Sequence, residues 1–176
     1  MVINTQRLTL TPHHLKYTNE LHAILGDAAT MQYYPAPYSK AQCEGWIAKS
    51  KANFNESGTG MFAVLLKDTK EFIGQCGIQF IKIDGVLLPE IGYHIHQKYW
   101  KKGYATEAAK ACLAYGFNKL NLREIFIHTY IKNIPSQRVA EKLGMKKLKT
   151  YDKVLANYGL VWPHVVYSMV KQDFVT

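Results

Sequence analysis

The chain has 176 residues, 48% of them hydrophobic, and a formal net charge of +9 at pH 7. This length suits one domain with a complete core, and the charge suits an anionic partner such as a phosphorylated cofactor, nucleic acid or acidic peptide. No apolar run approaches the roughly 20 residues of a membrane span. The N-terminus also lacks the basic-then-apolar layout of a signal peptide, so we expect a cytoplasmic protein. Three widely separated cysteines, Cys43, Cys76 and Cys112, favour reduced thiols over a disulfide framework or zinc finger.

The first part of the chain predicts a strand, two helices and an aromatic loop. Residues 7–11 alternate in polarity as a strand does, and Pro12 is expected to open a helix that ends at Gly26. The prolines of the segment Tyr33–Tyr38 block regular structure there. Ser39 is a reasonable N-cap for a second helix that runs to about residue 54.

The rest of the chain predicts further strands separated by two helices. Strands are expected over 61–66, 72–83, 90–96 and 123–131, with a late hairpin near 152–162 that leads into a last strand over 165–170. Helices are expected from Gly103 onward and from Asn133 to Gly144. The order is β-α-α-β-β-β-α-β-α-β-β, which we interpret as one α+β (mixed α/β) domain over residues 1–176, with a mixed sheet of about seven strands and about four helices.

A short basic loop between the 90–96 strand and the helix at Gly103 is the strongest functional signal. The sequence Trp100-Lys101-Lys102-Gly103-Tyr104-Ala105 places successive amides before a helix N-terminus, where the unpaired amides and the helix dipole attract anions. Gly103 lacks the Cβ that would hinder close approach. The pattern is neither a dinucleotide GxGxxG nor a GxxxxGK[ST] loop.

Two motifs together resemble the GNAT acetyltransferase superfamily. They are Glu90-Ile91-Gly92-Tyr93 followed by residues 100–108, and Asn133-Ile134-Pro135-Ser136 followed by residues 141–145. The opening residues 5–10 are similar to the RimJ/RimL-type branch, which acetylates protein N-termini and assorted small amines. The family pattern commonly has Gly where this chain has Lys101. If that position needs a positive φ, Lys carries strain there; if not, its amide and ammonium both remain useful.

The resemblance implies acetyl-CoA as co-substrate and a partly splayed sheet. Residues Trp100, Lys101, Lys102, Gly103, Tyr104, Ala105 and Thr106 would hold the pyrophosphate. The pantetheine would add like a strand to the free edge of Ile95 and His96. Asn133 would bind the pantetheine arm, and Ser136 would lie near the thioester sulfur and protonate or stabilise the leaving thiolate.

The implied reaction is direct attack of an amine on the thioester, because no Ser or Cys occupies a nucleophile motif. A backbone amide of Ile95 or His96 would contact the oxyanion. Glu90 is the candidate to accept the amine proton, directly or through water, and a solvated strand-end carboxylate is the alternative interpretation. Tyr130 and His128 are weaker candidates for this role, because they alternate with buried isoleucines, which favours core or hydrogen-bonded roles for them.

Several other interpretations stay open at this level. His94 and His96 share a strand face but have no third metal ligand at a suitable spacing, so we predict no metal. The Tyr33–Tyr38 loop and Trp46 either line an acceptor pocket or pack on the surface. The acceptor is a peptide N-terminus or a small amine, and a homodimer is plausible. A non-catalytic CoA-binding or regulatory module is the alternative function, while nucleic-acid binding lacks a clustered basic helix.

Overall fold

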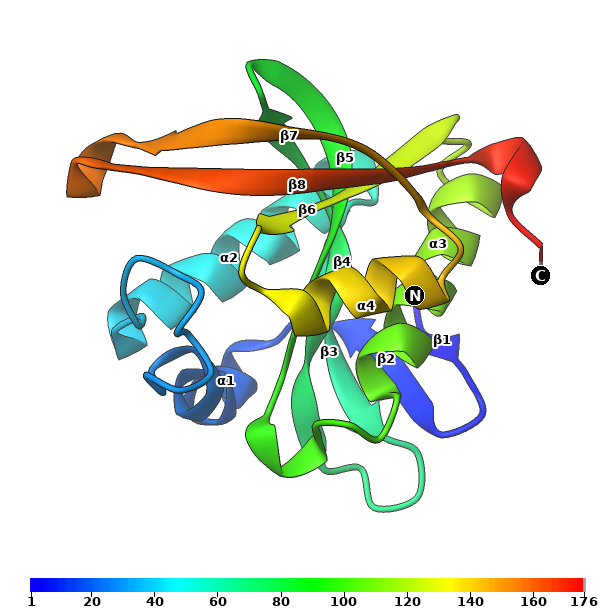
Figure 1. Cartoon of the computed structure of the whole chain (residues 1–176). Helices are drawn as coiled ribbons and strands as arrows, with labels where there is room; N and C mark the ends of the chain where they lie inside the picture. Colours follow the sequence, from blue (N-terminus) through cyan, green and yellow to red (C-terminus); the bar gives the residue numbers. More distant parts are fainter. Residues whose placement is uncertain (176) are drawn as a thin grey trace.

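One open sheet organises the molecule (Figure 1). The structure, a computed structural model, describes residues 1–175; Thr176, the last residue of the predicted domain, lies outside the described residues. Its elements are β1 (Ile3–Asn4), β2 (Leu8–Pro12), α1 (Thr18–Leu25), α2 (Lys40–Ser57), β3 (Gly60–Leu66), β4 (Phe72–Ile83), β5 (Val86–Ile95), α3 (Tyr104–Asn118), β6 (Glu124–Tyr130), α4 (Ile134–Lys142), β7 (Lys146–Leu155) and β8 (Leu160–Val170).

The predicted mixed α/β architecture is confirmed. Across residues 1–175 the sheet has eight strands in the order β1-β2-β3-β4-β5-β6-β8-β7. The β5–β6 pair is parallel, as a helical crossover through α3 requires, and the other pairs are antiparallel. The strand beyond the seven expected is β1, whose two residues are too few to give an alternating pattern.

The prediction that Pro12 opens the first helix is wrong. Pro12 is the last residue of β2 and pairs with Phe62 of β3, because a residue without an N–H is tolerated at a strand end. A 3₁₀ turn over Leu15–Tyr17 follows, capped by His14 Nδ1, which accepts from the amide of Lys16 at 3.1 Å. The helix α1 therefore begins only at Thr18.

The core divides between the helix pairs. Helix α3 buries residues on two stripes, as predicted, including Ala108, Cys112 and Leu113, and these pack with the inward residues of β5 and β6. Helices α1 and α2 enclose a second apolar cluster with Met31 of the loop that joins them. Ser39 caps α2 through a reciprocal capping box with Gln42.

The sheet opens beyond the middle of β5. In the described residues, the β5–β6 ladder has a single matched pair, Glu90 with Phe126. Past that pair β5 stays with β4 as far as the Gly74–Ile95 pair, while β6 stays with β8 as far as the Tyr130–His164 pair. The two halves of the sheet therefore diverge and leave the inner edge of β5 without a strand partner.

Candidate active site

The loop before α3 has the geometry of an anion cradle. Lys101 and Gly103 both adopt left-handed backbone, with φ of 60° and 82°, so Lys101 does carry the conformation that favours glycine. Gly103 is the N-cap of α3 and supplies no side-chain cap. The amide of Glu107 is the first one satisfied by the helix, bonding Gly103 O at 3.0 Å. The preceding first-turn amides therefore face outward without an intrahelical acceptor.

Thr5 and Arg7, near the N-terminus, hold the loop and the first turn of α3 in place. The Glu107 carboxylate accepts from Thr5 Oγ1 at 2.6 Å, from the Arg7 amide at 2.8 Å and from Arg7 Nε at 2.7 Å. Burial opposes ionisation of Glu107, but these hydrogen bonds outweigh it and hold its pKa below the ordinary value. Arg7 also donates to Lys102 O at 3.0 Å and stacks over the Tyr104 ring at 4.5 Å. Sequence reasoning did not assign Arg7 or Glu107 to the site, although both lie inside the quoted motifs.

The open edge of β5 can be read from its hydrogen bonds. The amide of His96 donates to Ile73 O of β4 at 2.9 Å, so the His96 backbone points away from the opening. In an antiparallel pair the next residue points the other way, which directs the Ile95 amide and carbonyl toward β6. Trp100 Nε1 donates to that carbonyl at 2.6 Å. Of the two predicted amides, that of Ile95 is the one that faces the opening.

Asn133 and Ser136 stand across the opening at the start of α4. Asn133 Oδ1 caps the helix by accepting from the Ser136 amide at 3.2 Å, which leaves the Asn133 side-chain NH₂ free to donate elsewhere. Ser136 Oγ lies 2.8 Å from the hydroxyl of Tyr93, which also donates to Ser136 O at 3.1 Å. Because Tyr93 belongs to β5, this contact joins the two sides of the opening. No pattern in the sequence predicts this contact.

Glu90 and His128 form a dyad at the point where the strands part. Glu90 Oε1 lies 2.5 Å from His128 Nδ1, and the two side chains are 13% and 6% exposed. Lys153 Nζ lies 3.1 Å from His128 Nε2. A carboxylate only accepts and an ammonium only donates, so Nδ1 carries the ring proton and Nε2 is the basic atom. This is the arrangement in which a carboxylate orients an imidazole base.

Further aromatic and titratable groups surround the dyad. The His164 ring stacks on His128 at 5.2 Å, and burial lowers the pKa of His164 to about 4. Tyr151 lies 6.2 Å from the His128 ring centroid, and Tyr130 stacks on Trp162 of β8 at 4.7 Å. The predicted hydrogen-bonded surroundings of His128 are therefore present, and they lie beside Glu90.

A hydrogen-bond chain fixes the aromatic loop over β5. Trp46 Nε1 donates to Gln75 Oε1 at 3.1 Å, the Gln75 amide meets His94 Nδ1 at 3.2 Å, and His94 Nε2 meets Tyr34 Oη at 2.9 Å. The indole can only donate, so each hydrogen bond of this series points toward Tyr34. The Tyr34 oxygen accepts the last one, which leaves its own O–H available as a donor. Burial lowers the pKa of His94 to about 4, which keeps this ring neutral. Tyr34 and Trp46 are thus tied to β5.

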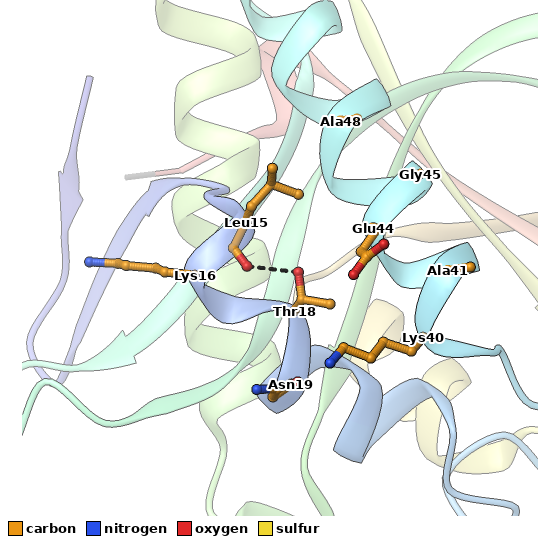
Figure 2. Close-up of a pocket in the computed structure, with 9 residues that line it drawn as sticks. All are labelled: Leu15, Lys16, Thr18, Asn19, Lys40, Ala41, Glu44, Gly45 and Ala48. Atoms are coloured by element: carbon orange, nitrogen blue, oxygen red, sulfur yellow. Dashed lines mark hydrogen bonds between the residues drawn. The ribbon is translucent and has the colours of Figure 1, made fainter.

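Among residues 1–175 no group of three or more His, Cys, Asp or Glu side chains is placed to hold a metal ion. Nor is any helix of that range long and apolar enough to cross a membrane. A separate groove of about 820 Å³ lies between α1 and α2 (Figure 2). Its lining includes Lys16, Lys40 and Glu44 but none of the predicted site residues.

Residues 7–146 match the family described as acetyltransferase (GNAT) domain. An uncharacterized N-acetyltransferase, YnaD of Bacillus subtilis, is 31% identical over 99% of both chains. A GNAT-family acetyltransferase structure from Bacillus anthracis superposes with a TM-score of 0.83 at 28% identity, covering 98% of this chain and 100% of the other. The microcin C7 self-immunity acetyltransferase MccE, solved with acetyl-CoA and AMP, shares the fold with a TM-score of 0.78 at 19% identity, over 94% of this chain and 93% of MccE.

The open sheet with its basic loop is the framework of a coenzyme-dependent acyl transferase. The chain belongs to the GNAT acetyltransferase family and is an acyltransferase.

Proposed function

We propose that this enzyme transfers an acetyl group from acetyl-CoA to a primary amine, a peptide N-terminus or a small amine, by direct attack in a ternary complex. The observation that carries the proposal is the Glu90–His128 dyad at the mouth of the opening between β5 and β6. In the proposed reaction, His128 Nε2 accepts the proton of the entering amine.

The coenzyme side of the opening fits a long ligand with a diphosphate end. The outward amides of the loop, with Lys101 and Lys102, would hold the pyrophosphate, and Trp100 to Thr106 form its walls. An added Cβ at Gly103 would come into contact with one side-chain atom, Arg7 Nη2, at 3.4 Å. The Ile95 amide and the Asn133 side chain offer hydrogen-bond donors to the amide-rich pantetheine. Ser136 would protonate or stabilise the leaving thiolate.

The acceptor side supplies proton transfer and positioning. Acetyl-CoA supplies an activated acyl carbon when bound. His128 Nε2 receives the proton of the amine, while Glu90 on Nδ1 stabilises the charged ring. An α-amine, with a pKa near 8, is roughly 3 kcal/mol easier to deprotonate than lysine, so this base is sufficient for a peptide terminus. The Tyr34 hydroxyl is available to a carbonyl of the acceptor.

The proposal is tested with peptide and small-amine panels and labelled acetyl-CoA. We expect acetyl-CoA to raise the melting temperature and label to reach at least one amine class. Glu90→Gln should lower kcat by roughly 100-fold without changing the thermal shift, because the general base His128 contributes at least that factor and would lose the carboxylate that stabilises its charged ring. A thermal shift without transfer to any amine would favour the non-catalytic coenzyme-binding module instead.

A curated relative gives a reason to begin with ribosomal peptides. The putative ribosomal N-acetyltransferase YdaF of Bacillus subtilis is 31% identical over 48% of this chain and 46% of its own length. Peptides that reproduce the N-termini of ribosomal proteins are therefore the first acceptors to test, beside polyamines. Equal rates across the whole panel would leave the acceptor class undefined.

A further inference from the structure

One amine of the protein already occupies the proposed acceptor position. Lys153, on β7, extends across β8 so that its Nζ lies 3.1 Å from His128 Nε2. The side chain is half-buried. The ring nitrogen that it meets is the one that Glu90 leaves basic. A primary amine on the free nitrogen of a carboxylate-oriented imidazole is the arrangement that the transfer reaction requires of its acceptor.

The other lysines of β7 have different surroundings. Lys146 Nζ pairs with Asp173 at 2.7 Å and Lys149 Nζ pairs with Asp84 at 2.5 Å, and both side chains are more than half exposed. Those carboxylates favour the charged, unreactive ammonium. Lys153 instead faces the imidazole of His128, which has His164 and Tyr151 packed beside it. Glu90, the carboxylate that attracts the Lys153 ammonium, lies on the far side of the His128 ring.

Partial burial also favours the neutral amine of Lys153 over its charged ammonium. Burial lowers the pKa of Lys153, against the opposing attraction of Glu90. An ordinary lysine with a pKa near 10.4 is neutral in only about one molecule per thousand at pH 7.5, so any lowering multiplies the nucleophilic fraction.

We propose that Lys153 is a self-acetylation site, modified by bound acetyl-CoA when no external amine fills the acceptor position. In this step the Lys153 ammonium gives one proton to His128 Nε2 and the neutral Nζ attacks the acetyl carbon. The N–C bond forms, the thioester C–S bond breaks, and the sulfur leaves as a thiolate that is then protonated to CoA thiol. A second Nζ proton is released to water as the amide forms. This inference rests on the proposed function, because it uses the same thioester and the same dyad.

The test incubates the full chain with acetyl-CoA and no acceptor, followed by intact-mass analysis and peptide mapping. We expect one acetyl group per chain, on Lys153. The rate should be unchanged when the protein is diluted, because amine and base belong to one molecule. Lys153→Arg should abolish this label, while the matched variant Lys149→Arg on the same strand should retain it. His128→Gln should slow labelling at least tenfold, and an added acceptor amine should slow it by competition.

Three outcomes would overturn the inference. The first is equal labelling of Lys153 in native and urea-unfolded protein, and the second is an unchanged rate in His128→Gln. The third is an unlabelled Lys153 in protein that shows the acetyl-CoA thermal shift and acetylates an added amine, which would leave the proposed function standing. The absence of both thermal shift and transfer would instead reject the proposed function, and this inference with it.

Discussion

Two residues of the loop before α3 have a left-handed backbone, and substituting each one gives a quantitative test of this anion cradle. Gly103 has φ 82° and Lys101 has φ 60°, a conformation that costs a residue with a Cβ roughly 1–2 kcal/mol. Gly103→Ala adds that strain and recovers about 0.4–1 kcal/mol from a less flexible unfolded chain. We expect a net loss of roughly 1 kcal/mol of stability. Lys101→Gly reverses the terms and should gain up to roughly 1 kcal/mol.

Measuring the Kd for acetyl-CoA distinguishes an anion-binding loop from an ordinary turn. The Cβ of Gly103→Ala would lie beside Arg7 Nη2, at 3.4 Å, and would hinder the close approach of a phosphate to the loop amides. Loss of one charge-assisted amide contact is worth about 1.5–3 kcal/mol, so the Kd for acetyl-CoA should rise roughly 10- to 100-fold. Lys101→Gly removes one ammonium, and its effect on Kd should be a few-fold at low salt and fade as salt screens it.

Gly85 provides a matched control. It has the same φ of 82°, sits in the β4–β5 turn, and has no heavy atom within 4 Å of an added Cβ. Gly85→Ala should therefore cost similar stability in urea unfolding and leave the calorimetric Kd for acetyl-CoA unchanged. If Gly103→Ala binds acetyl-CoA as tightly as the unmodified chain, the loop is not the pyrophosphate site.

Three further predictions concern neighbouring groups. Burial lowers the pKa of His13 to about 4, so between about pH 6.5 and pH 4 only the unfolded chain binds this proton. Urea unfolding at pH 5 should therefore show about 2 kcal/mol less stability than at pH 8 because of this residue. His13→Phe should remove this pH-dependent loss of stability. Glu107→Gln should cost about 1 kcal/mol at pH 7 through its charged hydrogen bonds; because the pKa of Glu107 is lowered, the difference between variant and parent should shrink as pH falls below the ordinary carboxylate range. Tyr34→Phe should reduce kcat/KM for the acceptor roughly tenfold with an unchanged acetyl-CoA Kd, and an equal loss in Kd would contradict a role on the acceptor side.

The cradle was predictable from the sequence because its determinants are local. A strand, a basic turn with Gly103 and a helix follow one another directly between Val86 and Asn118, and Asn133 caps its helix three residues before Ser136. Short-range patterns of this kind depend on backbone preference and helix ends. The sequence predicts strain at Lys101 only if the φ of this residue is positive, and the structure is needed to give that angle.

The acceptor side was not predictable, because its contacts depend on strand order. Glu90 meets His128 only because β5 and β6 are neighbours at the Glu90–Phe126 pair. Lys153 reaches His128 only because β8 lies between β6 and β7, so that residues 25 positions apart converge. Periodicity places each side chain on a face but carries no information on which strands are adjacent.

Acceptor choice and coenzyme binding depend on different parts of the fold. The proposed coenzyme contacts come from β5, the loop before α3 and the start of α4, which Arg7 and Glu107 support from one side. The proposed acceptor contacts come from the 26–38 loop and the β7–β8 hairpin (Figure 1). The dyad is the junction, since Glu90 belongs to β5 and His128 to β6. Substitutions in the hairpin should therefore change acceptor preference while leaving the Kd for acetyl-CoA intact, and changes at the Tyr93–Ser136 bridge should affect both sides at once.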